Sequence, residues 1–268
     1  MNMANNIITP YLNYSKLSDT FLKISKGFKE TNEDLKRFKT AIVDLGYPPY
    51  NDIGIKQLRY ISQEYRDRGK EHVEKYIDEF MTRYFHEKRL QAIALNWEKN
   101  KTIKKRLPIL RSAIKAHNLK MFEVVAPTLI PQFEGMIVDA FMIKGRVGGV
   151  ILQILLKHLL LENEEFQSEL SFDDAMHDYY KDHILTQFDH GDEIESDVSR
   201  NAILHGGDTD FGKETVSLKV ILLCDYLLDT FQNLKEETIV NAQKEVEKYR
   251  EDIEKRKRNN RRRKEIVN

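Results

Sequence analysis

The sequence predicts an all-α fold. Glycine and proline are scarce, at 12 and 6 of 268 residues, whereas Lys, Glu and Leu, which favour helices, are abundant. Apolar residues recur at spacings of three or four, and hydrophobic residues make up 41% of the chain, enough for a sizeable core. We expect an N-terminal helical subdomain over residues 1–100, a helical bundle over 101–240 and a basic helix or tail over 241–268.

Apolar spacing predicts four helices in the first hundred residues. The first covers Leu17–Leu45 with a break near Lys29–Asn32, and the run Gly46-Tyr47-Pro48-Pro49 ends it. The others cover Ile53–Tyr65, Gly69–Tyr84 and Phe85–Trp97, and the pattern also allows the last two to form one helix.

The bundle is expected to contain helices at Ile109–His117, Met121–Lys144, Val147–Asn163 and Glu214–Leu234. Pro127 and Pro131 should bend or divide the second of these, because proline cannot donate the helical hydrogen bond. Residues 161–200 contain 13 acidic residues and only two basic ones, a net charge of −11. This composition predicts a solvated loop with a helix inside it.

Several protein classes do not fit the sequence. The N-terminus has no basic stretch followed by an apolar run, so no secretory signal is expected. The longest apolar run, Val147 to Leu161, is too short to cross a bilayer, so we expect a cytoplasmic protein with no membrane contact. The single cysteine, Cys224, excludes an internal disulfide and is expected to be a buried thiol.

Two basic segments are candidate RNA-binding surfaces. Residues 88–120 have a net charge of +9, and eight of the ten residues from Lys255 to Lys264 are Lys or Arg. Such clusters bind phosphate backbones by releasing counterions, although each could equally be a solvated helix face or helix end. The candidate RNA-binding residues are Lys104, Lys105, Arg106, Arg111, Arg256, Arg258, Arg261, Arg262 and Arg263.

The most informative motif is Arg200-Asn201-Ala202-Ile203-Leu204-His205, followed by Gly206-Gly207. Arg can hold phosphate oxygens with its fork of donors, and His can take or give a proton near neutral pH. The alternative is an ordinary surface Arg with a capping or half-buried His. A short helix carrying Arg200 should end at the glycines, which would leave His205 exposed at the helix end.

This motif resembles the Arg-x4-His signature of HEPN domains. The resemblance extends over about 130 residues, through Ile109 to His117, Ile130-Pro131-Gln132-Phe133-Glu134-Gly135-Met136-Ile137 and Ser217 to Leu223. It implies a metal-independent endoribonuclease without a cofactor, with Arg200, Asn201 and His205 as catalytic residues. It also implies a homodimer with a shared cleft, and a role in toxin–antitoxin or phage-defence systems with an antitoxin or defence partner.

Two further points concern acidic and histidine residues. Glu134 lies in an apolar stretch and is either a surface residue or a supporting partner that orients Arg200.

His177, His183 and His190 are spaced by six and seven residues, which does not match the four-residue pair that binds zinc on a helix. We therefore expect no metal site, and the sequence contains no phosphate-binding or dinucleotide loop.

A rival interpretation is a helical RNA-binding or protein-interaction module in which the motif is catalytically inactive. On an ideal helix, Arg200 and His205 would lie about 140° apart, so a single copy would converge poorly on one phosphate. A two-fold dimer would compensate for this geometry.

Overall fold

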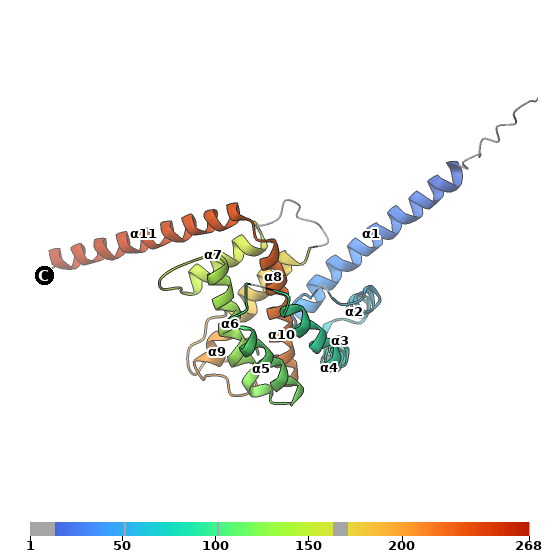
Figure 1. Cartoon of the computed structure of the whole chain (residues 1–268), viewed down its shortest axis with the longest axis horizontal. Coiled ribbons are helices and arrows are strands. Elements are labelled where there is room, and N and C mark those ends of the chain that lie inside the picture. The colour runs from blue at the N-terminus through green and yellow to red at the C-terminus, as the bar shows by residue number, and fades with distance from the viewer. Residues whose placement is uncertain (1–13, 51, 101, 163–170, 268) are drawn as a thin grey trace, which may run out of the picture.

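The structure is a computed structural model that describes residues 14–50, 52–100, 102–162 and 171–267. At residues 14–26, 28–29 and 260–267 it describes the backbone alone. The described residues form eleven α-helices and no strand, which confirms the all-α prediction (Figure 1).

Four helices make up the first part of the chain. They are α1 (Tyr14–Asp44), α2 (Ile55–Arg68), α3 (Lys70–Tyr84) and α4 (Glu87–Trp97). The first half of α1 projects from the helical body, whereas its second half packs against α2 and α8 (Figure 1).

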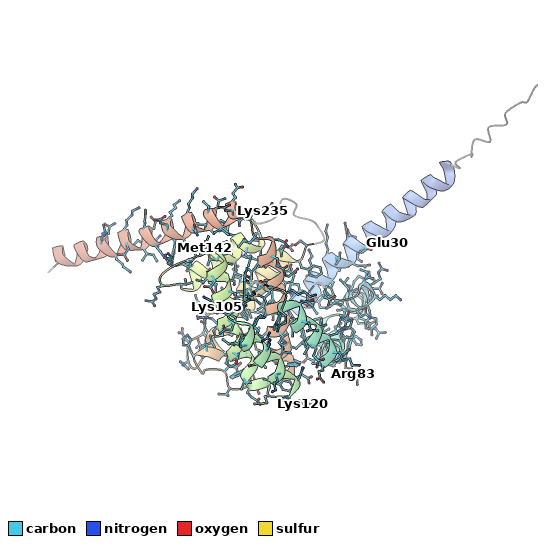
Figure 2. The ribbon with its side chains drawn as sticks, viewed as in Figure 1. Glu30, Arg83, Lys105, Lys120, Met142 and Lys235 are labelled. Carbon is cyan, nitrogen blue, oxygen red and sulfur yellow. The ribbon has the colours of Figure 1, made fainter. Side chains whose placement is uncertain are left out.

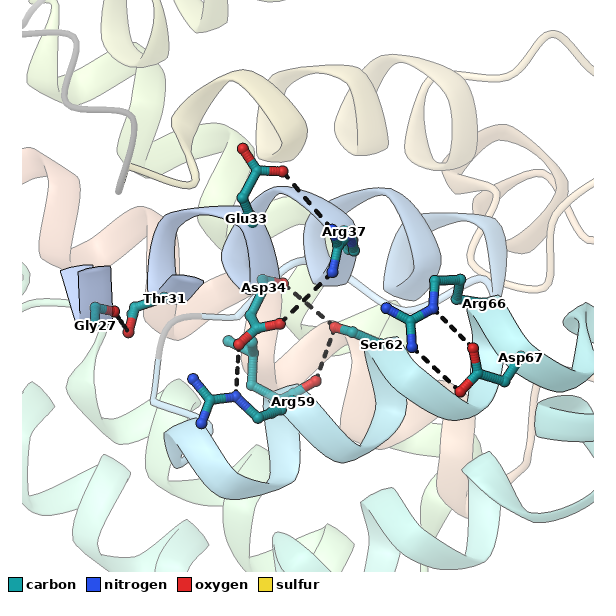
Figure 3. A network of polar contacts seen from close by, with 10 residues as sticks. Gly27, Thr31, Glu33, Asp34, Arg37, Arg59, Ser62, Arg66 and Asp67 are labelled. Atoms are coloured by element: carbon teal, nitrogen blue, oxygen red, sulfur yellow. Dashed lines mark hydrogen bonds and ion pairs between the residues drawn. The ribbon is translucent and has the colours of Figure 1, made fainter. Parts of the chain in front are cut away.

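A polar network joins α1 to α2 at the buried Asp34 (Figure 3). Its carboxylate accepts a hydrogen bond from Arg59 Nε at 2.5 Å, and Ser62 Oγ donates to its backbone oxygen at 3.3 Å. Ser62 lies on the face of α2 that also buries Leu58 and Ile61, whereas the Arg59 side chain is partly exposed. The contact fixes how the two helices pack, because a buried carboxylate without donors would be costly.

One predicted detail of these helices is wrong, and one alternative left open is decided. The expected break near Lys29–Asn32 does not occur, and Thr31 Oγ1 donates to the Gly27 carbonyl oxygen at 2.8 Å inside a continuous α1 (Figure 3). The hydroxyl is therefore satisfied within the helix and does not interrupt it. The helices α3 and α4 are separate, because the backbone turns at Phe85 and becomes extended at His86.

The second part of the chain contains seven α-helices and three single turns. They are α5 (Leu107–Asn118), η1 (Phe122–Val124), α6 (Val125–Ala140), α7 (Gly149–Leu160), α8 (Asp173–Tyr179), the π-helical turn η2 (Tyr180–Ile184), α9 (Arg200–Leu204), α10 (Glu214–Thr230), η3 (Phe231–Asn233) and α11 (Glu236–Val267).

Neither proline divides α6. Pro127 lies in the first turn, where the backbone N–H has no partner inside the helix. Pro131 lies inside the helix, which continues to Ala140 with Leu129, Ile130 and Phe133 fully buried. Burial of this face offsets the one hydrogen bond that Pro131 cannot donate.

The centre of the protein is α10. Nearly every residue from Val216 to Leu228 is buried, and the helix contacts α3, α4, α5 and α6. The buried side chains of residues 1–100 and 101–240 form one contiguous core, and Cys224 lies inside it as predicted. Burial also raises the pKa of the Cys224 thiol.

The long helix α11 begins before the expected boundary at 241 and packs against α7 over its first half. Lys235 marks the point where the chain enters it (Figure 2). His158 of α7 is buried, and its Nε2 lies 2.8 Å from Glu245 Oε2 of α11. The second half of α11 projects from the body (Figure 1). Within the described ranges, none of the helices combines the length and apolar character needed to span a bilayer.

The first prediction concerns Asp225, the acid of α10 that accepts hydrogen bonds from Tyr50 Oη and from Trp97 Nε1, the latter at 2.6 Å. Asp225→Leu should lower the free energy of unfolding by about 2–5 kcal/mol, because both buried donors lose their acceptor. Asp225→Asn keeps an acceptor and should cost less than about half as much. Urea unfolding measures both variants, and equal stabilities would contradict the prediction.

The second prediction concerns His117 of α5, whose Nδ1 lies 2.7 Å from Ser217 Oγ of α10. Burial lowers the pKa of His117 from 6.5 to about 4, so the folded state favours the neutral ring. The corresponding stability is present above pH 6.5 and lost as the pH falls toward 4, by up to about 3 kcal/mol. His117→Asn should remove this pH dependence of the unfolding free energy. Ser217→Ala leaves the imidazole in place and should keep it.

Candidate functional site

The short helix α9 is held at its N-terminus by a chain of hydrogen bonds. Ser199 caps the helix, its Oγ accepting from Ala202 N at 3.3 Å and from Thr186 Oγ1 at 2.9 Å. Asn201 Nδ2 donates to the Thr186 carbonyl oxygen at 2.8 Å. These bonds tie the first turn of α9 to the segment that follows η2, and so fix the position of Arg200.

The two glycines close α9 as expected. Gly206 has φ +75°, Gly207 N donates to Ala202 O at 2.8 Å, and Gly206 N donates to Ile203 O at 3.3 Å. This is the Schellman pattern of a helix end. A Cβ at Gly207 would lie 1.9 Å from the Phe188 ring, so any other residue here would displace that ring. His205 is the C-cap residue that directly follows α9, and its side chain is exposed, as predicted.

Arg200 and Glu134 form a two-pronged ion pair between α9 and α6. Arg200 Nε lies 2.7 Å from Glu134 Oε1, and Nη2 lies 3.3 Å from Oε2. The Arg200 side chain is 33% exposed and that of Glu134 is 17% exposed. Glu134 therefore contacts Arg200 and is not a simple surface residue, whereas its effect on any reaction stays a prediction.

Asn201 lies between Arg200 and the supporting loop. Its Oδ1 accepts from Arg200 Nη1 at 2.8 Å, while its Nδ2 binds the Thr186 backbone. Three of the five N–H groups of the guanidinium are therefore occupied, and the remaining two have no partner among the described residues. The arrangement holds the guanidinium in one orientation and leaves donors for an anion.

The loop before α9 is anchored to α10 by Lys219. Its Nζ lies 2.7 Å from Asp197 Oδ2 and 4.8 Å from the centre of the Tyr47 ring. Lys219 is buried, so its charge needs the carboxylate and the ring face. The pair fixes the chain three residues before Arg200 and links the motif to the core.

The core packing beside Glu134 is aromatic. Tyr180 is fully buried, and its ring meets that of Phe133 edge to face at 5.9 Å. Burial raises the pKa of Tyr180 well above its ordinary value, and the neighbouring Glu134 carboxylate adds to the shift. Tyr180 therefore contributes a neutral phenol to the core beside Glu134.

The candidate RNA-binding residues are not gathered in one place. Lys104 and Lys105 are exposed on the turn before α5. Arg106 instead donates to Gln132 at 3.0 Å and pairs with Asp139 at 2.6 Å, with its guanidinium lying against Gly135 of α6. Arg111 is paired with Glu98. These two cations are thus engaged by carboxylates that the charge count alone did not reveal.

The basic end of α11 is only partly described. Arg256 and Arg258 are exposed on the projecting half of this helix. The side chains of Arg261, Arg262 and Arg263 lie outside the described residues. Within the described residues, α11 packs mainly against α7.

Each of the three histidines of the acidic segment contacts a different neighbouring side chain. His183 stacks on Tyr179 with ring centres 4.7 Å apart, and burial lowers its pKa. His190 meets the Phe188 ring, and His177 Nδ1 lies 3.3 Å from Asp178 Oδ1. Among the described residues, no three His, Cys, Asp or Glu side chains converge as ligands for a metal ion.

Several residues that shape the site were not recognised from the sequence. Ser199 could have been found, because a serine directly before a helix is a typical cap. Thr186, Asp197 and Lys219 carry no comparable local signal, since their roles depend on contacts between distant segments.

Comparison with known proteins adds no relative. No family model matches the chain, and no curated protein or solved structure matches it either.

The third prediction concerns the ion pair between Arg200 and Glu134. A double-mutant cycle with Arg200→Gln and Glu134→Gln should give a coupling free energy of about 1–3 kcal/mol, because the pair is two-pronged and half-buried. The control is the same cycle on Arg83 and Glu79, an exposed pair at the periphery (Figure 2). It should give less than about 0.5 kcal/mol. Equal couplings in urea unfolding would contradict the prediction.

Proposed function

We propose that the protein is a metal-independent endoribonuclease of the HEPN type. The observation that carries this proposal is the arrangement on α9, where an oriented guanidinium with unused donors and an exposed imidazole lie on one short helix. Arg200 is held by Glu134 and Asn201, and His205 is presented at the helix end. The resemblance of the motif to the HEPN signature supports the same assignment.

The reaction requires no group beyond those of the protein and the RNA. The 2′-hydroxyl next to the scissile phosphate attacks phosphorus, and its proton passes to His205. The bond from phosphorus to the 5′ oxygen then breaks, and this oxygen takes a proton from the imidazolium, which returns to its neutral form. Arg200 binds the phosphate oxygens and opposes the charge that develops on them. The products are a 2′,3′-cyclic phosphate and a 5′-hydroxyl end. DNA lacks the 2′-hydroxyl and would not be cut.

The proposed active form is a homodimer. Arg200 starts α9 and His205 caps its end, so the two side chains leave the helix at different positions along its single turn. A two-fold axis beside α9 would let His205 of one copy complement Arg200 of the other at one phosphate. RNA would reach this site along the exposed Lys104 and Lys105, or along the basic end of α11.

A second candidate function is a helical RNA-binding or protein-interaction module with an inactive motif. It is favoured by the fact that Arg200 already has a carboxylate partner, as structural arginines often do. Within either proposal, the resemblance suggests a place in a toxin–antitoxin or phage-defence system with an antitoxin or defence partner.

The fourth prediction tests the proposed catalytic roles. His205→Ala should reduce RNA cleavage about 10²- to 10⁴-fold without changing the thermal midpoint, because the side chain is exposed. His190→Ala, another exposed histidine, serves as the matched control and should retain activity. Arg200→Lys should also lose most of the activity, since lysine cannot replace the fork of donors.

Cleavage should persist in EDTA and stop on a substrate with a single 2′-deoxy substitution at the cut site. Full activity of His205→Ala would exclude the proposed chemistry. RNA binding without cleavage by the intact protein would favour the second candidate function.

A further inference from the structure

A buried histidine joins the last long helix to the body of the protein. His158 lies in the last turn of α7, and only 3% of its surface is exposed. Its ring faces α11, which packs along α7 before its second half projects from the body (Figure 1). The proposed RNA cleavage uses none of the residues at this junction.

Each ring nitrogen of His158 faces a carboxylate. Nε2 lies 2.8 Å from Glu245 Oε2 of α11, and Nδ1 lies 2.6 Å from Oε2 of Glu162, which follows α7. The contact at Nδ1 is an ion pair by distance but is not aligned as a hydrogen bond. An ionised carboxylate has no proton to donate, so each of these short contacts needs a proton on the ring.

The two protonation states of the ring differ in how they meet these carboxylates. A neutral imidazole has one N–H, so its other nitrogen would turn a lone pair toward a carboxylate oxygen. The imidazolium donates at both nitrogens and places one positive charge between two negative ones. Only the imidazolium therefore satisfies both contacts at once.

Lys157 completes the charged groups around the ring. Its Nζ lies 2.8 Å from Glu162 Oε1 and 3.4 Å from Glu245 Oε2, and the hydrogen bond to Glu162 raises its pKa, so it stays charged at neutral pH. Burial raises the pKa of Glu245, but hydrogen bonds from His158 and Lys157 lower it to below its ordinary value. Among the described contacts, no charged group of α6 or α8, the other helices packed on α7, meets the ring.

Two further contacts hold α11 to the body, and neither changes its charge near neutral pH. Gln243 Nε2 donates to the Phe141 carbonyl oxygen at 3.0 Å, and Arg250 Nη2 donates to the Arg146 carbonyl oxygen at 3.0 Å. Of the groups in all these contacts, His158 is the one of a type that titrates between pH 5 and 8.

We propose that His158 is a pH-sensitive clamp between α7 and α11. Below neutral pH the imidazolium binds Glu162 and Glu245 together and holds α11 against the body. As the pH rises, the ring releases one proton to solvent, and one carboxylate then faces a bare nitrogen. The contribution of the clamp is therefore present at lower pH and lost as the pH rises.

The clamp controls where the basic end of α11 lies. Arg256 and Arg258 are exposed on the half of α11 that extends beyond it (Figure 1). A loosened junction frees this half from its docked orientation and so changes how the two arginines meet RNA. This consequence rests on the proposed function, whereas the clamp itself does not.

Hydrogen exchange of the full-length protein tests the clamp. After correction for the intrinsic exchange rate, the amides of residues 242–250 should lose about tenfold in protection between pH 6 and pH 8, the effect of one charge-assisted hydrogen bond. The amides of residues 216–228 in α10 should lose none, because the neutral state of His117 stabilises the core over the same range. Ring ¹⁵N spectra should show protons on both nitrogens of His158 at pH 6 and on one at pH 8, with the signal assigned by its absence in His158→Gln.

Variants test which groups are responsible. The amide of Glu162→Gln can donate to a neutral Nδ1, so α11 should stay protected at both pH values. The control is Glu64→Gln, at the more exposed contact between Glu64 and His72 on α2 and α3, which should leave the pH dependence of α11 intact. His158→Gln should give weaker protection of α11 that does not change with pH. If that variant fails to fold, Glu162→Gln still decides the question.

Three results would overturn the proposal. These are a neutral His158 ring at pH 6, equal corrected protection of residues 242–250 at pH 6 and pH 8, or an unchanged pH dependence in Glu162→Gln. An equal loss of protection in α10 would also overturn it, because the pH effect would then belong to the whole fold. None of these readouts depends on RNA, so the clamp and the proposed cleavage can fail independently.

Discussion

Burial of α10 is the constraint on which the rest of the structure depends. A helix that is apolar on all sides must lie inside the protein, and its few polar side chains must then find partners within the core. Four of them each use a different segment. Ser217 contacts His117 of α5, and Lys219 pairs with Asp197 of the acidic loop. Asp225 accepts from Tyr50 and Trp97. Tyr226 donates to Asp173 of α8. The polar groups of one helix thus connect the early helices, the bundle and the motif loop.

The motif helix depends on these contacts. A helix of five residues is unstable alone, because ordering the backbone of its first turn costs more free energy than its few hydrogen bonds recover. Its position comes from the Ser199 cap, the Gly206 turn and the nearby pair of Lys219 with Asp197. Arg200 then crosses to Glu134 on α6. A small change in α10 would therefore move a guanidinium that α10 does not touch.

The sequence was sufficient to predict those features whose signal lies within a few neighbouring residues. The long apolar helices, the glycine turn after His205 and the buried Cys224 follow from spacing and residue type. Local signals failed at Pro131 and Thr31, because burial of α6 outweighs the cost of a proline and an internal hydrogen bond satisfies the threonine hydroxyl. The contact of Arg200 with Glu134 was one of two alternatives, since no local pattern specifies a pair 66 residues apart. Charge counts likewise did not reveal that Arg106 and Arg111 have acidic partners.

These partners change the distribution of charge that a ligand would meet. With Arg106 and Arg111 paired with carboxylates, four members of the candidate RNA-binding set are exposed and make no ion pair among the described residues: Lys104, Lys105, Arg256 and Arg258. A phosphate bound at Arg200 would therefore meet further positive charge from these residues and not from Arg106 or Arg111.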